Sequence, residues 1–147
     1  MDILHATGVY KGFETGEGSL QVLRGVSLSL QAGQSLALTG ESGSGKSTLL
    51  YLVGGLDLPD KGQIWIADSD IATLGDPGRA ALRRGMVGLV FQQFNLIPSL
   101  NVADNLAFHA RKSGSEDDAW TAHLAKCLGL SAFLNRFPEQ LSAGQQQ

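Results

Sequence analysis

The stretch Gly40-Glu41-Ser42-Gly43-Ser44-Gly45-Lys46-Ser47 is the part of this sequence that most constrains its fold. It fits G-x-x-x-x-G-K-[ST], the pattern of a phosphate-binding loop. The apolar run at residues 35–39 predicts a buried strand before the loop, and Thr48-Leu49-Leu50 begins a helix after it. Because a phosphate-binding loop joins a strand to a helix N-terminus, we predict a nucleotide site here.

The loop offers several groups that bind phosphate. The helix N-terminus supplies backbone N–H groups without intrahelical partners. Glycines allow positive φ angles, Lys46 provides a positive charge for the β and γ phosphates, and the hydroxyl of Ser47 is a ligand for Mg²⁺. A flexible Gly/Ser linker is the alternative, but linkers are not flanked by a buried strand and a leucine-rich helix. The residues expected to contact the nucleotide are Gly40, Glu41, Ser42, Gly43, Ser44, Gly45, Lys46, Ser47 and Thr48.

Composition limits the other functions. The net charge of -3 gives no basic footprint for nucleic acid. No apolar run approaches the roughly 20 residues that span a bilayer, and no export signal is recognisable. Cys127 is the only cysteine, which excludes an internal disulfide and fits a reducing compartment. We therefore expect a cytoplasmic protein, soluble or peripheral to a membrane.

The first thirty residues predict two antiparallel strands. Residues 2–10 and 20–30 are separated by a glycine-rich turn at 12–18, and residues 26–30 alternate apolar and polar as in a half-buried strand. Tyr10 would end the first strand. Its ring either stacks on a nucleotide base or is an ordinary strand-end aromatic.

Four further elements are expected before residue 100. Gly54-Gly55 ends the first helix, whose apolar face would comprise Leu49, Leu50, Leu52 and Val53. Residues 63–67 predict a strand, and the following Asp68-Ser69-Asp70 is read as a turn in preference to a Walker B carboxylate. A helix would run from the N-cap Asp76 to about Arg84, and residues 86–91 would form another buried strand. The arginines of the helix that begins at Asp76 are expected to form a solvated face: Arg79, Arg83 and Arg84.

The last third of the chain predicts helices. An apolar stripe begins at Val102, a capping box at Ser115 and Asp118 starts a second helix, and residues 131–137 predict a third. Trp120, Leu124, Cys127 and Leu128 would line the second helix, making Cys127 a core residue. Before this block, the apolar residues of the Phe94–Leu100 loop either fold inward or form a patch for a partner.

The chain finishes Leu141-Ser142-Ala143-Gly144-Gln145-Gln146-Gln147. Together with the phosphate-binding loop and Phe91-Gln92, this ending resembles the ATP-binding subunit of an ABC transporter over the whole chain. Residues 54–57 and 90–98 look most like the branch that serves lipoprotein release and macrolide or peptide export. The resemblance implies that Tyr10 stacks on adenine, that Gln92 reaches Mg²⁺ and the attacking water, and that Leu141–Gln145 is the signature motif.

The implied fold is α/β: a P-loop NTPase core with an N-terminal antiparallel β subdomain and an α-helical subdomain. Residues 1–147 would be a single incomplete ATP-binding domain, with the β subdomain and core at 1–100 and the helical subdomain at 101–147. The family's Walker B aspartate, catalytic glutamate and switch histidine would lie beyond Gln147. We therefore expect this chain alone to be weakly stable, to have some apolar core surface uncovered, and to bind ATP with little hydrolysis.

The implied function is ATP binding and hydrolysis coupled to export or release of a substrate through a membrane partner. ATP and Mg²⁺ are the expected ligands, with Lys46 and Gln92 catalytic and Ser47 and Gln92 at the metal. The Phe94–Leu100 loop would dock the membrane-spanning subunit at the inner face of the plasma membrane. A second ATP-binding subunit would pair head to tail. Ser142, Gly144 and Gln145 would then offer hydrogen bonds to the γ phosphate of the ATP across the interface.

Two other functions fit parts of the sequence. One is a different P-loop enzyme, a GTPase or nucleotide kinase, with Asp57 or Asp68 as the Mg²⁺ carboxylate; the guanine motif N-K-x-D is absent. The other is a naturally short, non-catalytic nucleotide-binding protein that pairs with a complete subunit through residues 142–145.

Overall fold

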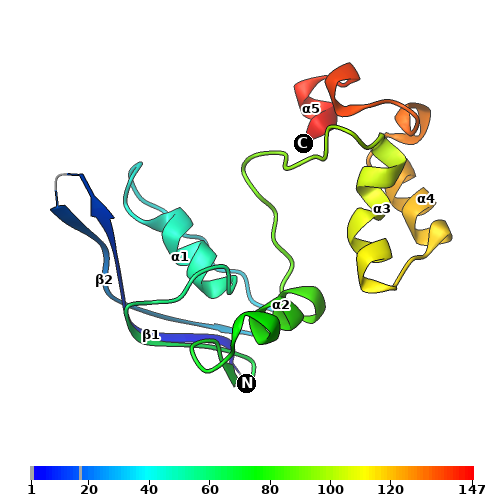
Figure 1. Ribbon diagram of the computed structural model, residues 1–147. Coiled ribbons are helices and arrows are strands. Elements are labelled where there is room, and N and C mark those ends of the chain that lie inside the picture. The colour runs from blue at the N-terminus through cyan, green and yellow to red at the C-terminus, as the bar shows by residue number, and fades with distance from the viewer. Residues whose placement is uncertain (1, 17) are drawn as a thin grey trace. The chain divides into compact units, whose positions relative to one another are not determined.

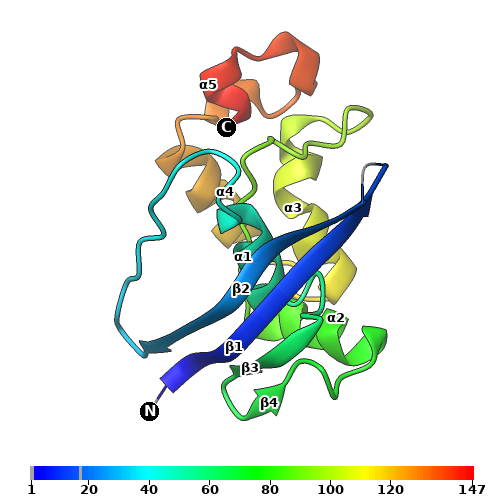
Figure 2. The ribbon, with the colours of Figure 1, turned by 90° about the vertical axis from the view of Figure 1, so that its left-hand side faces the viewer.

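A long β-hairpin is the scaffold of the first part of the chain. In the computed structural model, which describes residues 2–16 and 18–147, β1 (Asp2–Thr15) pairs antiparallel with β2 (Gly18–Gln31). β3 (Lys61–Ile66) pairs antiparallel with the other edge of β1, and the short β4 (Ser69–Asp70) follows it (Figure 2). The order β2-β1-β3-β4 confirms the predicted antiparallel subdomain.

The two strands of the hairpin are longer than predicted. Gly12 pairs with Gln21 and Thr15 with Gly18, so most of the expected turn is strand and Tyr10 does not end β1. Backbone pairing at the far end of a two-stranded ribbon needs no buried side chains, which is why the hydrophobic pattern did not reveal it. The alternation predicted for residues 26–30 is confirmed, because apolar side chains there are half-buried and the serines are exposed.

Two helices pack on one face of this sheet. α1 (Lys46–Val53) and α2 (Asp76–Gly85) contribute to a core that they share with the strands (Figure 1). Gly54 ends α1 as predicted. The buried residues of the core that the sheet and the two helices share are Ala6, Val9, Leu23, Leu49, Leu52, Ile64, Ile66, Ile71 and Leu82.

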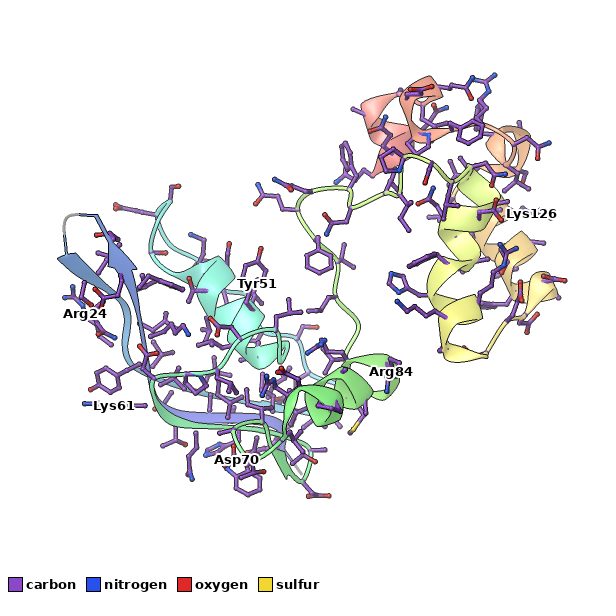
Figure 3. All side chains as sticks on the ribbon, in the orientation of Figure 1. Arg24, Tyr51, Lys61, Asp70, Arg84 and Lys126 are labelled. Atoms are coloured by element: carbon purple, nitrogen blue, oxygen red, sulfur yellow. The ribbon has the colours of Figure 1, made fainter. Side chains whose placement is uncertain are left out.

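Three details of these helices differ from the prediction. Leu50 is exposed, because only residues three apart, Leu49 and Leu52, face the sheet. α2 has Gly75 as its N-cap, one residue before the predicted Asp76. Its arginines are not all solvated: Arg79 pairs with Asp76, Arg83 donates to the Gly55 carbonyl, and of the three only Arg84 is exposed (Figure 3).

The predicted strands at residues 35–39 and 86–91 were wrong. Neither run belongs to the described sheet, and a strand without a neighbour leaves its N–H and C=O groups unpaired. Leu38 and Val87 still pack against the core, whereas Leu36 and Val90 are exposed. The sequence predicts uncovered apolar surface on Leu36, Leu38, Val87 and Leu89. Only Leu36 is exposed, and the other three are half-buried. The strand at 63–67 is confirmed as β3, and Asp68 lies in the turn before β4, as the turn interpretation required.

A second compact unit comprises Val90–Gln147, and the first ends at Leu89. The second unit contains α3 (Val102–Ser113), α4 (Asp118–Cys127) and α5 (Ala143–Gln146), with 3₁₀ turns at Ser131–Phe133 and Pro138–Gln140. The residues before α3 belong to this unit. No helix within residues 2–16 and 18–147 is long and apolar enough to cross a membrane.

The helical unit corrects four local predictions. Asp117, not Ser115, caps α4, because its side chain accepts from the Trp120 N–H at 2.9 Å. Ala125 is the buried residue of α4, while Trp120 and Leu128 are exposed. Cys127 is also exposed and therefore is not a core residue. The predicted third helix is only a 3₁₀ turn followed by irregular chain.

Candidate nucleotide-binding site

The glycines of the phosphate-binding loop have the backbone geometry that the sequence predicts. Gly40, Gly43 and Gly45 have φ angles of 146°, 79° and 87°. Gly45 is the N-cap of α1, so the loop leads directly into a helix N-terminus whose first N–H groups lack intrahelical partners. This arrangement aims backbone donors and the positive end of the helix dipole at one place, as anion binding requires.

The loop packs against β2 on one side and leaves open space on the other. A Cβ at Gly45 would lie 2.9 Å from Val22 Cγ1 and 2.9 Å from Leu23 Cδ2. A Cβ at Gly43 would have no atom within 4 Å, so there is room for a phosphate group beside this glycine. A hollow of about 230 Å³ lies beside the loop and is lined by Leu23, Val26, Leu38, Thr39, Gly40, Ser44, Gly45, Lys46 and Leu49.

The ammonium of Lys46 lies inside the loop. Its Nζ donates to the carbonyl oxygens of Gly40 at 2.9 Å and Glu41 at 2.6 Å, and to Ser44 Oγ at 3.2 Å. These oxygens hold the Lys46 ammonium within the loop. On nucleotide binding, phosphate oxygens would replace them as its hydrogen-bond acceptors. Ser47 follows in the first turn of α1 and is exposed, so its hydroxyl is accessible to a metal ion.

Tyr10 lies on the hairpin close to the strand that supports the loop. It pairs with Arg24 on β2, directly after Val22 and Leu23, which contact the loop. Its ring lies over Gly25, where a Cβ would be 3.0 Å from the Tyr10 hydroxyl oxygen. The side chain is 40% exposed. Part of this aromatic residue is therefore exposed near the loop, as base stacking requires.

Sequence reasoning missed a cluster around Lys11. Its Nζ is 2.9 Å from Asp57 Oδ2 and donates to the Leu58 carbonyl at 2.8 Å, while the Gly12 N–H donates to Asp60 Oδ2 at 2.7 Å. Burial alone would raise the pKa of Asp57, but the hydrogen bonds from Lys11 and the Leu58 N–H and the charge of Lys11 lower it. An aspartate already paired in this way fastens the 57–60 turn to β1 and is a poor candidate for a Mg²⁺ ligand.

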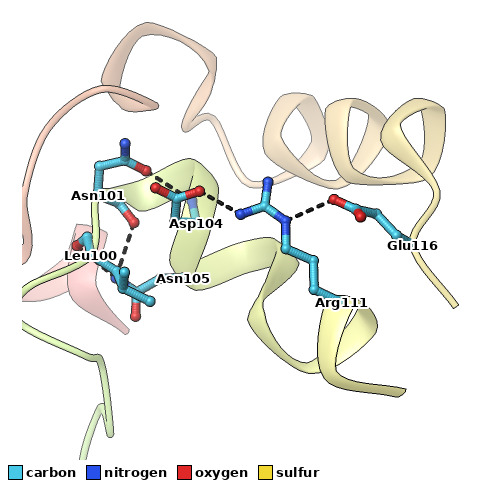
Figure 4. Close-up of polar contacts among 6 residues, drawn as sticks. All are labelled: Leu100, Asn101, Asp104, Asn105, Arg111 and Glu116. Carbon is cyan, nitrogen blue, oxygen red and sulfur yellow. Dashed lines mark hydrogen bonds and ion pairs between the residues drawn. The ribbon is translucent and has the colours of Figure 1, made fainter. Parts of the chain in front are cut away.

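The loop that carries Gln92 belongs to the helical unit. Gln92 is exposed in irregular chain, and Asn95 has a left-handed φ of 49°. Further along, the side chain of Asn105 binds the loop backbone. Its Oδ1 accepts from the Ile97 N–H at 2.8 Å. Its Nδ2 donates to the Leu100 carbonyl oxygen at 2.9 Å (Figure 4). Nothing in the sequence pattern pointed to this residue, since a single asparagine in a helix has no distinctive signal.

The predicted signature residues surround the start of α5. Ser142 is its N-cap, and the Ser142 N–H donates to Gln145 Oε1 at 2.9 Å. Gln146 Nε2 donates to the Pro138 carbonyl at 2.6 Å and holds this segment against the preceding 3₁₀ turn. Ser142 and Gly144 are exposed, and a Cβ at Gly144 would contact nothing within 4 Å. Both are accessible to another molecule.

The sequence profile of the ABC transporter family matches residues 23–147. The chain belongs to this family. It is 46% identical over 134 residues to the methionine import ATP-binding protein MetN of Caulobacter vibrioides and 36% identical over 149 residues to the lipoprotein-releasing system ATP-binding protein LolD of Acinetobacter baylyi. These alignments cover 89% and 99% of this chain but 40% and 65% of the relatives.

Other comparisons agree with this assignment. The macrolide export ATP-binding/permease protein MacB of a Shewanella species is 40% identical over 148 residues, which cover 99% of this chain and 23% of MacB. A dimeric structure of the ATP-binding cassette MJ0796 in a post-hydrolysis state, bound to ADP and Pi, superposes with a TM-score of 0.87 at 33% identity. That match covers 97% of this chain and 65% of the cassette. The chain thus has the fold of an ABC ATP-binding domain and spans at most about two thirds of these relatives.

Proposed function

We propose that this chain binds ATP with Mg²⁺ at the Gly40–Ser47 loop, as the nucleotide-binding part of an ABC transporter. The observation that supports this most is the position of Lys46, whose ammonium is held inside a loop of positive-φ glycines at a helix N-terminus. On binding, phosphate oxygens replace the loop oxygens around Nζ. Charge-assisted hydrogen bonds of this kind are short and strong, so the exchange favours the nucleotide.

The remaining site residues have separate proposed roles. Ser47 is accessible in the first turn of α1 and coordinates Mg²⁺ through its hydroxyl, while Gln92 reaches the metal and the attacking water. Tyr10 stacks on the adenine through its open ring face. Lys46 and Gln92 act on the reacting phosphate. ATP hydrolysis belongs to the complete subunit.

We further propose two protein partners. A second ATP-binding subunit pairs head to tail and receives hydrogen bonds on its γ phosphate from Ser142, Gly144 and Gln145. Because ADP lacks that phosphate, hydrolysis removes the contacts that favour the closed pair. A membrane-spanning subunit docks on the Phe94–Leu100 loop at the inner face of the plasma membrane. We propose export or release as the direction of transport, although the similar proteins include an importer as well as exporters.

Nucleotide binding by a lysine variant tests the proposal. Mg²⁺-ATP is titrated into wild-type protein, Lys46→Ala and the control Lys126→Ala, and the dissociation constants are compared by calorimetry. Lys126 is exposed on α4, and its substitution by alanine also removes one positive charge. We expect Lys46→Ala to weaken binding by about tenfold or more, since a lost charge-assisted hydrogen bond costs about 1.5–3 kcal/mol. Equal affinity in all three proteins would contradict the assignment of the site.

A further inference from the structure

The regular pairing of β1 is interrupted at Tyr10 on both sides of the strand. The register between β1 and β2 shifts between Val9 and Tyr10 and again directly after Lys11. The register between β1 and β3 shifts between Thr7 and Tyr10. An irregularity of this kind disrupts the ladder of hydrogen bonds and redirects the side chains beside it. The sheet alone therefore does not fix the position of the Tyr10 ring.

The turn that precedes β3 supplies further contacts at this place. The Asp60 N–H donates to the Tyr10 carbonyl at 2.9 Å, and Asp60 Oδ2 accepts from the Gly12 N–H at 2.7 Å. Between these two bonds, Lys11 Nζ donates to the Leu58 carbonyl at 2.8 Å. Tyr10 and the two residues that follow it are thus all attached to one turn.

The side chain of Lys11 lies at the centre of this attachment. Its Nζ is 2.9 Å from Asp57 Oδ2 and 3.8 Å from Asp60 Oδ1. The Lys11 side chain is only 13% exposed, whereas those of the two aspartates are 42% and 48% exposed. A largely buried ammonium without partners is costly, so these contacts hold Lys11 and the turn together.

The same turn is connected to the phosphate-binding loop through α1. Gly45 of the loop is the N-cap of this helix. After its last turn, the Leu56 N–H donates to the Tyr51 carbonyl at 2.9 Å, so the chain remains hydrogen-bonded up to the residue before the turn. A continuous series of hydrogen bonds therefore runs from the loop through α1 and the turn to Tyr10.

We propose that Lys11 is a positioning residue that holds Tyr10 at the distance from the phosphate-binding loop that ATP spans. The proposal rests on the proposed function, in which Tyr10 stacks on the adenine and Gly40–Ser47 binds the phosphates. A ligand that makes both contacts gains affinity when they are already correctly spaced, because it does not bear the cost of ordering them. Lys11 therefore contributes to the binding of ATP but not of a ligand that consists of phosphates alone.

Calorimetric titration of wild type and Lys11→Met with two ligands, each with Mg²⁺, tests this role. ATP has a base and phosphates, whereas inorganic tripolyphosphate has phosphates alone. Methionine keeps an unbranched apolar side chain and removes the ammonium. We expect ATP affinity to fall about three- to tenfold, since stacking on one base contributes roughly fivefold or more, and tripolyphosphate affinity to stay unchanged. Equal losses for both ligands, or no loss for either, would overturn the proposal.

Lys61→Met is the matched control for the loss of a positive charge near Tyr10. Lys61 pairs with Tyr10 from β3 and is exposed (Figure 3). Because an exposed charge is screened by salt, this variant should bind both ligands within about twofold of wild type. A fall in the ratio of ATP to tripolyphosphate affinity as large as that of Lys11→Met would assign the effect to charge and refute the positioning role.

A double-mutant cycle with Tyr10→Ala separates positioning from a general loss of stability. If Lys11 acts through the tyrosine, Lys11→Met has no further effect on ATP affinity once the ring is absent. Independent, additive losses would contradict the proposal. If Lys11→Met does not fold, Asp57→Ala takes its place, because it removes the carboxylate beside Nζ at a side chain that is 42% exposed. It should lower the affinity ratio in the same direction, and an unchanged ratio would count against the positioning role.

The two ligands also separate this proposal from the proposed function. If wild-type protein bound neither ligand, the proposed function would fail and the role of Lys11 with it. If it bound ATP no more tightly than tripolyphosphate, phosphate binding would stand, but base stacking and its positioning would both fail. If wild type preferred ATP and Lys11→Met kept the same preference, the role of Lys11 would fail alone.

Discussion

At the scale of single residues, the absent side chain of Gly45 shapes the site as much as the charge of Lys46. Gly45 combines a φ of 87° with contact between the loop and β2, where Val22 and Leu23 occupy the space that a Cβ would need. The loop can therefore lie against the hairpin and still turn into α1. The same close approach places the lysine that follows it at the start of the helix.

Gly45→Ala should destabilise the protein by about 1–3 kcal/mol, the usual cost of forcing a non-glycine residue into this region of φ and ψ. The free energy of unfolding is measured by urea denaturation. Gly144→Ala is the matched control, because Gly144 is helical and has no neighbour within 4 Å of a Cβ. It should be neutral or slightly stabilising. Equal effects of the two substitutions would show that the loop is not constrained as described.

The Lys11–Asp57 pair predicts a dependence of stability on pH. The folded-state pKa of Asp57 is lowered from 3.8, so the pair stabilises the fold fully above that value. The stabilisation is lost as the pH falls through the lowered pKa. Asp57→Asn should therefore cost about 0.2–1 kcal/mol at pH 7, discounted for solvent exposure, and the difference from wild type should shrink below pH 3.8.

Denaturant unfolding at several pH values measures this difference, with Asp68→Asn as the control at an exposed turn carboxylate. The control should change stability by less than about 0.5 kcal/mol. A destabilisation by Asp57→Asn that grew on acidification would have the wrong sign for this account.

At the scale of elements, α1 has two unlike faces. Leu49 and Leu52 are buried against the sheet, whereas Leu50 and Tyr51 are about half exposed. Leu52→Ala should destabilise by about 2–5 kcal/mol, because the side chain is fully buried and leaves a cavity. Leu50→Ala, the same change on the same helix, should cost less than about 1 kcal/mol. Urea denaturation of both variants checks the orientation of α1; similar losses would contradict it.

Sequence patterns correctly predicted most helices and the antiparallel strands. They wrongly predicted strands for the two apolar runs at residues 35–39 and 86–91. Helices satisfy their own backbone hydrogen bonds, so a local pattern is enough to place α1 and α3. A strand needs a neighbour, and an apolar run does not show whether one pairs with it. Cys127 was wrongly predicted to be a core residue for a related reason. An apolar stripe on a helix does not specify which of its residues face the core, and Cys127 is exposed.

At the candidate site, the fixed spacing of the loop motif was sufficient to predict the positive φ angles of its glycines. Contacts between distant residues were not predictable in the same way. Lys11 meets Asp57 and Asn105 meets Ile97 only because turns bring them together, and neither pair has a local signal. The roles of Tyr10, Gln92 and Ser142 stay predictions that follow from the family resemblance.

At the scale of the whole molecule, the chain combines a unit that contains the phosphate-binding loop with a unit that contains Gln92 and the signature residues. The proposed function uses both units, because it takes the phosphate-binding loop from one subunit and the signature contacts from its partner. The match to the family profile over residues 23–147 includes both parts. The central claim is therefore that ATP binds at the loop of the first unit.

The most direct test is to titrate Mg²⁺-ATP into isotopically labelled protein and follow each backbone amide resonance by NMR. We expect the largest shifts at Gly43, Gly45, Lys46 and Ser47, with a smaller change at Tyr10, because phosphate should bind the loop amides and the base should lie over the ring. The absence of shifts, or the largest shifts in a region remote from the loop such as α4, would contradict it.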